Sequence, residues 1–194
     1  MTNASGGERL PKLKQEEMTE DQRKVAEEML AGPRKALGGP FHPWLRSPTM
    51  ARRLAHFGEY MRYLSPLPRD LKELTVLITA RHLGSRYEWQ AHHPWAVEAG
   101  VKPEVADAIS RNERPEGMTP AQTTIYNFVT QLERNYEVDD DTYAEALALL
   151  GESLLIELVV YIGLYFTVGM TLSVARVAIP PGGAILPDLK STAG

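Results

Sequence analysis

An uncharged run near the C-terminus most constrains what this chain can fold into. It spans residues 158–175 and reads LVVYIGLYFTVGMTLSVA. Its length reaches the threshold for a transmembrane helix, but Glu157 and Arg176 flank it closely, and glycines and hydroxyl side chains interrupt the apolar residues. We therefore predict a helix that is buried on all sides, at the centre of a bundle or at a subunit interface, and no membrane attachment.

Helix start and stop signals divide the rest of the chain into an all-α pattern. Two capping boxes, Thr19–Gln22 and Thr119–Gln122, each place a hydroxyl three residues before a glutamine. Glycine and proline pairs separate the apolar periodic segments, and no stretch alternates convincingly with a period of two. We predict about eight helices, at approximately 19–30, 48–63, 68–83, 86–99, 103–112, 119–135, 139–150 and 153–177.

These helices are expected to form one bundle. The length of 194 residues suits a single domain or a subunit that completes its core by association. The polar, glycine-containing start predicts a flexible arm over residues 1–18, followed by an all-α domain over 19–180 and a tail over 181–194. The Gly/Pro-rich stretch 36–48 is expected to be a loop whose aromatic residues pack onto the domain.

Composition excludes several function classes. The net charge of −4 comes without a basic block, so the electrostatic footprint of a nucleic-acid-binding protein is missing. The chain has no cysteine, which excludes disulfides, thiolate metal sites and thiol catalysis. The polar N-terminus lacks the apolar core of a signal peptide, so a cytoplasmic protein is expected.

Glu73, Glu88 and His92 are the strongest candidates for chemistry. Glu88 and His92 stand four residues apart, with Ser85 three residues before Glu88, so the three share one face of a predicted helix. Glu73 lies on the preceding helix, which can approach the same pocket in an antiparallel hairpin. A carboxylate that orients an imidazole gives a general acid or base near neutral pH. The alternative is a solvated surface pair, which is common at this spacing.

The segment 73–92 reads E-x11-S-x2-E-x3-H. It resembles the carboxymuconolactone decarboxylase and alkylhydroperoxidase D superfamily, whose peroxidases carry E-x11-C-x2-C-x3-H. Glu73 and His92 match the glutamate and the histidine, while Ser85 and Glu88 stand at the two cysteine positions. The resemblance extends over about 45–180 and implies an alkylhydroperoxidase D-like helical fold. Because both thiols are absent, it does not imply thiol peroxidase activity.

What remains of the motif suits the decarboxylase branch. The resemblance implies a cofactor-free, metal-free carboxy-lyase that acts on a small carboxylated lactone from aromatic-compound degradation, with Glu73, Glu88 and His92 as catalytic residues. Ser85, Arg81 and Arg86 are candidate contacts to the anionic substrate, although either arginine is equally consistent with a solvated surface charge. The superfamily also implies a homo-oligomer, a trimer or a hexamer.

Alternatives from other classes stay open. The chain is also consistent with a related isomerase or hydrolase, with a non-catalytic oligomer that kept the scaffold after losing its thiols, and with a metal-dependent enzyme. No HExxH or similar spacing supports the metal-dependent alternative. A closed pocket with Glu73 and His92 more than about 8 Å apart would favour the non-catalytic alternative.

Overall fold

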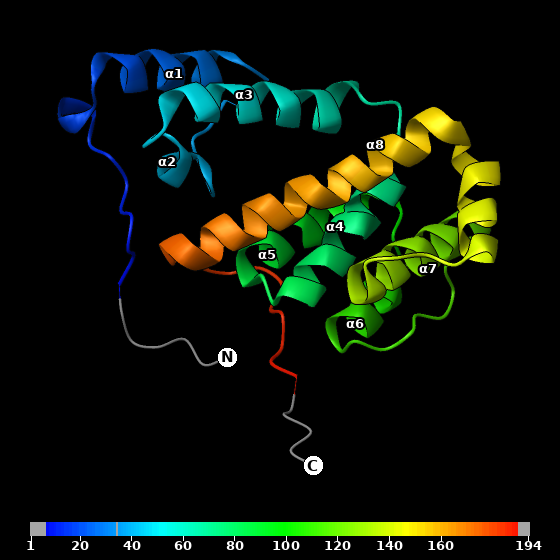
Figure 1. Ribbon diagram of the computed structural model, residues 1–194. Helices are drawn as coiled ribbons and strands as arrows, with labels where there is room; N and C mark the ends of the chain where they lie inside the picture. The colour runs from blue at the N-terminus through cyan, green and yellow to red at the C-terminus, as the bar shows by residue number, and fades with distance from the viewer. Residues whose placement is uncertain (1–6, 34, 190–194) are drawn as a thin grey trace. The chain divides into compact units, whose positions relative to one another are not determined.

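All regular structure in the described part of the chain, residues 7–33 and 35–189 of the computed structural model, is helical (Figure 1). Besides a 3-10 turn, η1 (Gln15–Glu17), and a π-helical turn, η2 (Tyr60–Leu64), it contains eight α-helices. These are α1 (Glu20–Ala31), α2 (Phe41–Trp44), α3 (Pro48–Glu59), α4 (Arg69–Leu83), α5 (Arg86–Ala99), α6 (Pro103–Ser110), α7 (Pro120–Asn135) and α8 (Asp140–Ala175). The predicted all-α fold is confirmed.

Two compact units make up the chain. The larger unit, Pro66–Gly169 with the segment from Ile179 onward, has α4 at its centre. Every residue of α4 from Leu71 to Ala80 is buried, because α5, α6 and α7 all contact this helix. Leucine, isoleucine and valine side chains from these helices form one apolar core with residues from both halves of α8. The buried position of α4 explains its nearly continuous apolar sequence.

The smaller unit contains the segment up to Ser65 and Met170–Ala178. In it, α3 packs against α1 and α2. The aromatic residues of the 36–48 stretch are buried as expected, and they form the short helix α2 rather than a loop without regular structure. Trp44 Nε1 donates a hydrogen bond of 3.0 Å to Thr171 Oγ1. Arg9 N donates to Ala175 O, so this part of the predicted N-terminal arm is held by the backbone of α8.

Local signals fix several helix ends. Both predicted capping boxes form, and Gly84 and Gly100 end α4 and α5 in the left-handed conformation. The predicted helices 139–150 and 153–177 run together as α8, with non-helical dihedral angles at Gly151. The predicted helix 48–63 ends as an α-helix at Glu59 and continues as the π-helical turn. The domain boundaries at 19 and 180 stay a prediction.

The capping box of α7 allows a first test of how a local signal stabilises a helix end. Thr119 Oγ1 accepts a hydrogen bond of 3.1 Å from Gln122 N. We expect Thr119→Ala to lower the free energy of unfolding by about 1 kcal/mol, because a first-turn N–H loses its acceptor. Urea unfolding measures the change. Thr123→Ala, on the same exposed turn, removes a hydroxyl that caps no N–H and should have less than half this effect.

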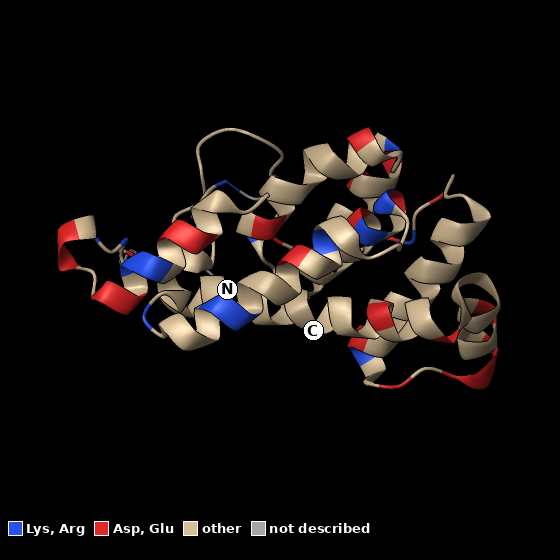
Figure 2. Cartoon of the chain, turned by 90° about the horizontal axis from the view of Figure 1, so that it is seen from above, with Lys and Arg blue, Asp and Glu red and all other residues tan. Residues whose placement is uncertain are grey.

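The charged residues are mixed in sign along the described helices (Figure 2). Several form ion pairs on the surface of their own unit, such as Arg52 with Glu28 and Arg69 with Glu98.

Helix α8 is long and apolar enough to cross a membrane by length and composition. Only 28% of its most apolar window is buried within the chain, so the predicted burial of this helix on all sides is not reached by one copy alone.

Candidate active site

The two helices that carry the candidate residues form an antiparallel hairpin in the larger unit. Helix α4 begins after Pro68 and ends at Gly84, whose φ of 64° turns the chain toward α5. Helix α5 contains Pro94, which cannot donate the backbone bond to the carbonyl of Gln90. Glu73 near the start of α4 and His92 at the middle of α5 therefore reach the same level of the hairpin.

The structure brings the three predicted catalytic residues together. His92 Nδ1 lies 2.6 Å from Glu73 Oε2, and His92 Nε2 lies 3.4 Å from Glu88 Oε2. All three side chains are buried; His92 is 2% exposed, and Glu73 and Glu88 are each 6% exposed. A solvated surface pair is therefore wrong for Glu88 and His92. The imidazole stands between two carboxylates, each facing one of its nitrogens.

This arrangement can hold and move a proton. The short bond to Glu73 fixes the orientation of the imidazole ring, because a carboxylate accepts the N–H on Nδ1. Nε2 is then left on the side of Glu88, which stands in the first turn of α5. A proton can pass between these side chains without a large movement of any of them. The separation of 2.6 Å is also far below the 8 Å that would favour a non-catalytic scaffold.

Aromatic rings enclose the imidazole. Trp95 and Tyr165 both lie edge-on to His92, with ring centroids at 4.9 Å and 5.1 Å. Tyr161 packs against Tyr165, and its hydroxyl donates to the Tyr165 hydroxyl at 3.4 Å. Sequence reasoning assigned both tyrosines only to an apolar helix. Their separation of four residues indicated a shared face, but nothing local indicated that this face meets His92.

The predicted substrate contacts lie elsewhere. Arg81 Nη1 donates to the backbone oxygens of Ser110 and Pro187, and Arg86 Nη2 donates to Asp188 Oδ1 at 2.6 Å. Both arginines thus bind the segment after α8 rather than the Glu73–His92 pair. Ser85 makes no side-chain cap bond on α5, and its Cβ lies against Gly169. These three assignments stay predictions without a contact that supports them.

A second buried carboxylate, which the sequence did not single out, lies on α7. Glu133 is 3% exposed, and its Oε1 accepts a hydrogen bond of 2.5 Å from Thr79 Oγ1 on α4. Burial raises the pKa of Glu133 to about 7, against the opposing effects of the Thr79 bond and of Arg134. The one signal in the sequence is the position of Glu133, which lies four residues after the buried Val129.

Glu133 faces a histidine as well. Its Oε2 lies 3.9 Å from Nδ1 of His82, a partly exposed residue near the end of α4. Burial lowers the pKa of His82, and the positive charge of Arg134 lowers it further. Because Glu73 and His82 are nine residues apart, they project from opposite sides of α4. The larger unit therefore holds two separate Glu–His pairs.

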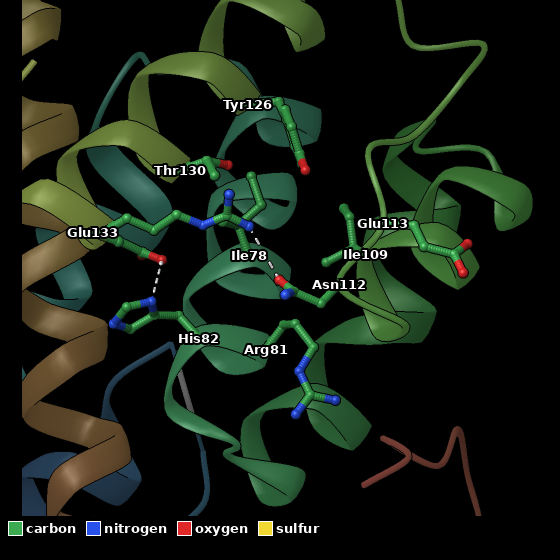
Figure 3. Close-up of a pocket in the computed structure, with 10 residues that line it drawn as sticks. Ile78, Arg81, His82, Ile109, Asn112, Glu113, Tyr126, Thr130 and Glu133 are labelled. Carbon is green, nitrogen blue, oxygen red and sulfur yellow. Dashed lines mark hydrogen bonds and ion pairs between the residues drawn. The ribbon is translucent and has the colours of Figure 1, made fainter. Parts of the chain in front are cut away.

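A small pocket opens beside the second pair (Figure 3). Its volume is about 30 Å³, too small for an organic substrate in this conformation. It is lined by residues of α4, α6, the turn after α6, and α7: Ile78, Arg81, His82, Ile109, Asn112, Glu113, Tyr126, Thr130, Glu133 and Arg134. None of the residues around His92 lines it. Among the described residues, no group of three or more His, Asp or Glu side chains is arranged to hold a metal ion.

Comparisons with known proteins agree with the predicted family. The sequence model of the carboxymuconolactone decarboxylase family matches residues 48–131. A solved structure of the debrominase Bmp8, a cysteine-to-alanine variant in complex with 2,3,4-tribromopyrrole, has the same fold. It is 14% identical, with a TM-score of 0.69, and the match covers 92% of this chain and 95% of that chain. A search of curated proteins found no significant match.

Proposed function

Because residues 48–131 belong to the carboxymuconolactone decarboxylase family, we propose that this protein is a cofactor-free acid/base enzyme. It acts as a decarboxylase-like carboxy-lyase in the cytoplasm, on a small carboxylated lactone or a related intermediate of aromatic-compound degradation. The observation that carries this proposal is the buried imidazole of His92, held at 2.6 Å by Glu73 and faced by Glu88. The absence of cysteine favours acid/base over thiol chemistry.

The proposed decarboxylation requires only that water is excluded from the intermediate and that a proton is supplied to carbon. In a conjugated lactone, the bond between the ring carbon and the carboxylate breaks, CO₂ leaves, and the electron pair passes into the conjugated carbonyl. A proton is then added to carbon, so that one proton is consumed for each CO₂ released. His92 delivers this proton, Glu73 orients the ring, and Glu88 returns a proton from solvent. The aromatic rings of Trp95 and Tyr165 exclude water from the intermediate.

A substrate screen in D₂O tests this function. Purified protein is incubated with unsaturated carboxylated lactones and with β-keto acids, and CO₂ release and product mass are followed. We expect CO₂ release with one deuterium bound to carbon in each product molecule. Turnover with deuterium incorporation but without CO₂ release would favour a related isomerase. Absence of any turnover across the series would favour the non-catalytic scaffold.

We also propose that the chain forms a homo-oligomer through α8, a trimer or a hexamer. Several large apolar residues on this helix are exposed within the larger unit, among them Ile156 at 63% and Val160 at 41%. They are separated by one helical turn, so they form part of one face. A second copy that covers this face would complete the burial expected of an uncharged helix.

Association through α8 leads to a testable expectation. We expect Ile156→Glu to shift the molar mass from the oligomer toward the monomer, because a carboxylate at the contact loses its hydration on assembly. Light scattering after size-exclusion chromatography in detergent-free buffer measures the mass. Glu145→Gln, an exposed carboxylate on the part of α8 before Gly151, should leave the mass unchanged. A wild type that is monomeric throughout would contradict the proposal, and one that stays soluble only in detergent would favour a membrane-bound helix.

A further inference from the structure

The pocket beside Glu133 has unusual polar chemistry. Three residues that line this pocket each carry a buried side-chain atom without a hydrogen-bond partner in the described part of the chain: Arg81 Nε, Thr130 Oγ1 and Glu133 Oε2. A buried polar atom without a partner destabilises the fold, so such atoms rarely gather by chance. Glu133 is one of the lining residues, and only 3% of its surface is exposed. This pattern indicates a site for a polar ligand.

The charges around the pocket indicate the sign of that ligand. Arg81 and His82 come from α4, and Arg134 comes from α7; Glu113, from the turn after α6, is the other acidic group that lines the pocket besides Glu133. Arg134 Nη2 donates to Asn112 Oδ1 at 3.2 Å. With Glu133 neutral, two guanidinium groups outweigh one exposed carboxylate. The pocket then favours an anion.

The donors indicate the geometry of the ligand. Thr130 and Glu133 are three residues apart on α7, so their side chains project from the same face. A protonated Glu133 offers an O–H at Oε2, because its Oε1 already accepts from Thr79. Thr130 Oγ1 and Arg81 Nε are further donors. The volume of about 30 Å³ is room for about two waters, which matches the two oxygens of a carboxylate whose organic part points out of the pocket.

We propose that this pocket binds the carboxylate group of a small organic acid, with protonated Glu133 and Thr130 as donors and Arg81 and Arg134 as the balancing charges. The site lies on the opposite side of α4 from Glu73 and is independent of the reaction proposed for His92. The raised pKa of Glu133 supports it, since the carboxyl group is still protonated close to neutral pH. Below this pKa the anion binds without proton transfer, and above it each bound anion brings one proton with it.

Acetate titrations of the full chain test the proposal. Chemical shifts of backbone amides give the dissociation constant at pH 6 and at pH 8.5. We expect saturable binding with shifts in α7 and at the end of α4, and an affinity that falls by about tenfold for each pH unit above the pKa of Glu133. Glu133→Gln imitates the protonated acid, so it should keep the pH 6 affinity within about threefold and lose the pH dependence. Thr130→Val should weaken acetate by about tenfold at pH 6.

Controls separate this site from its alternatives. Glu113→Gln, which removes the exposed carboxylate of the same pocket, should keep the pH dependence of the wild type. His92→Ala should bind acetate as the wild type does. Equal affinity for chloride and acetate would overturn the carboxylate geometry. An absence of saturable binding at pH 6, or an unchanged pH dependence in Glu133→Gln, would overturn the proposal. If Glu133→Gln does not fold, the wild-type pH series and Thr130→Val decide.

Discussion

Replacing His92 with alanine is expected to lower kcat/KM for the proposed carboxylated substrate by about 10²- to 10⁴-fold, because the proposed reaction loses its proton donor. The change removes the one group that touches both buried carboxylates, Glu73 at 2.6 Å and Glu88 at 3.4 Å. Deuterium incorporation from D₂O should fall with the rate, since carbon protonation is the step that fails. Steady-state CO₂ release measures the loss, with the substrate identified by the screen.

His93 provides a matched control for this experiment. It is the neighbouring residue on α5, is less buried than His92, and packs against Trp89 with ring centroids 5.9 Å apart. His93→Ala should keep kcat/KM within about threefold. His92→Gln keeps a side-chain amide that can bond Glu73, so it separates loss of proton transfer from loss of folding. A His92→Ala protein with wild-type turnover would remove His92 from the proposed mechanism.

The part of the candidate active site that the sequence predicted rests on local geometry. Glu88 and His92 are four residues apart on one helix, and the glycine at position 84 closes a short hairpin that returns α5 alongside α4. Because the hairpin is antiparallel, it brings Glu73 of α4 toward the face of α5 that carries Glu88 and His92. Helix ends were equally local, since the capping boxes at Thr19 and Thr119 depend on residues three positions apart.

What the sequence did not predict depends on contacts over long separations. Tyr165 meets His92 across more than seventy residues, and Arg81 reaches the carbonyl of Pro187 across 106. No periodicity encodes such pairings. The role of Arg81 and Arg86 was expected from charge alone, and charge does not show that both side chains bind the segment after α8. The short helix α2 was missed because its Gly/Pro-rich sequence resembles a loop until its aromatic residues are buried.

Glu133 illustrates the same limit for electrostatics. A glutamate on a helix is usually a surface residue. Only the spacing of Glu133 from Val129 and Ile125, one and two helical turns away, places it on the buried face of α7. On the buried face, the Glu133 carboxyl group loses its hydration. In return it accepts one hydrogen bond from Thr79 and faces His82 at 3.9 Å. The resulting rise in its pKa is a property of the packed structure. The raised pKa of Glu133 also makes the stability of the folded protein depend on pH, even without a ligand.

Glu133→Gln is expected to stabilise the protein at pH 8 and to have a much smaller effect at pH 5. The folded pKa of about 7 lies above the ordinary value of 4.5, so this carboxyl group favours folding below pH 4.5 and loses that contribution as pH rises toward 7. The full difference corresponds to about 3 kcal/mol. Thermal unfolding in acetate-free buffers should show a gain of about 5–10 °C for the variant at pH 8.

The comparison at two pH values isolates Glu133 from its neighbour. The lowered pKa of His82 acts in the opposite direction, because that contribution is present at high pH and lost as pH falls through the range in which the unfolded histidine takes up a proton. Wild type and variant both contain His82, so the part of this effect that does not depend on Glu133 cancels in their difference. Glu113→Gln, which removes an exposed carboxylate paired with Arg111, should show no difference that grows with pH. If Glu133→Gln changes the unfolding temperature equally at pH 5 and pH 8, Glu133 is already ionised in the folded protein, and the protonated donor proposed for the second site is lost with it.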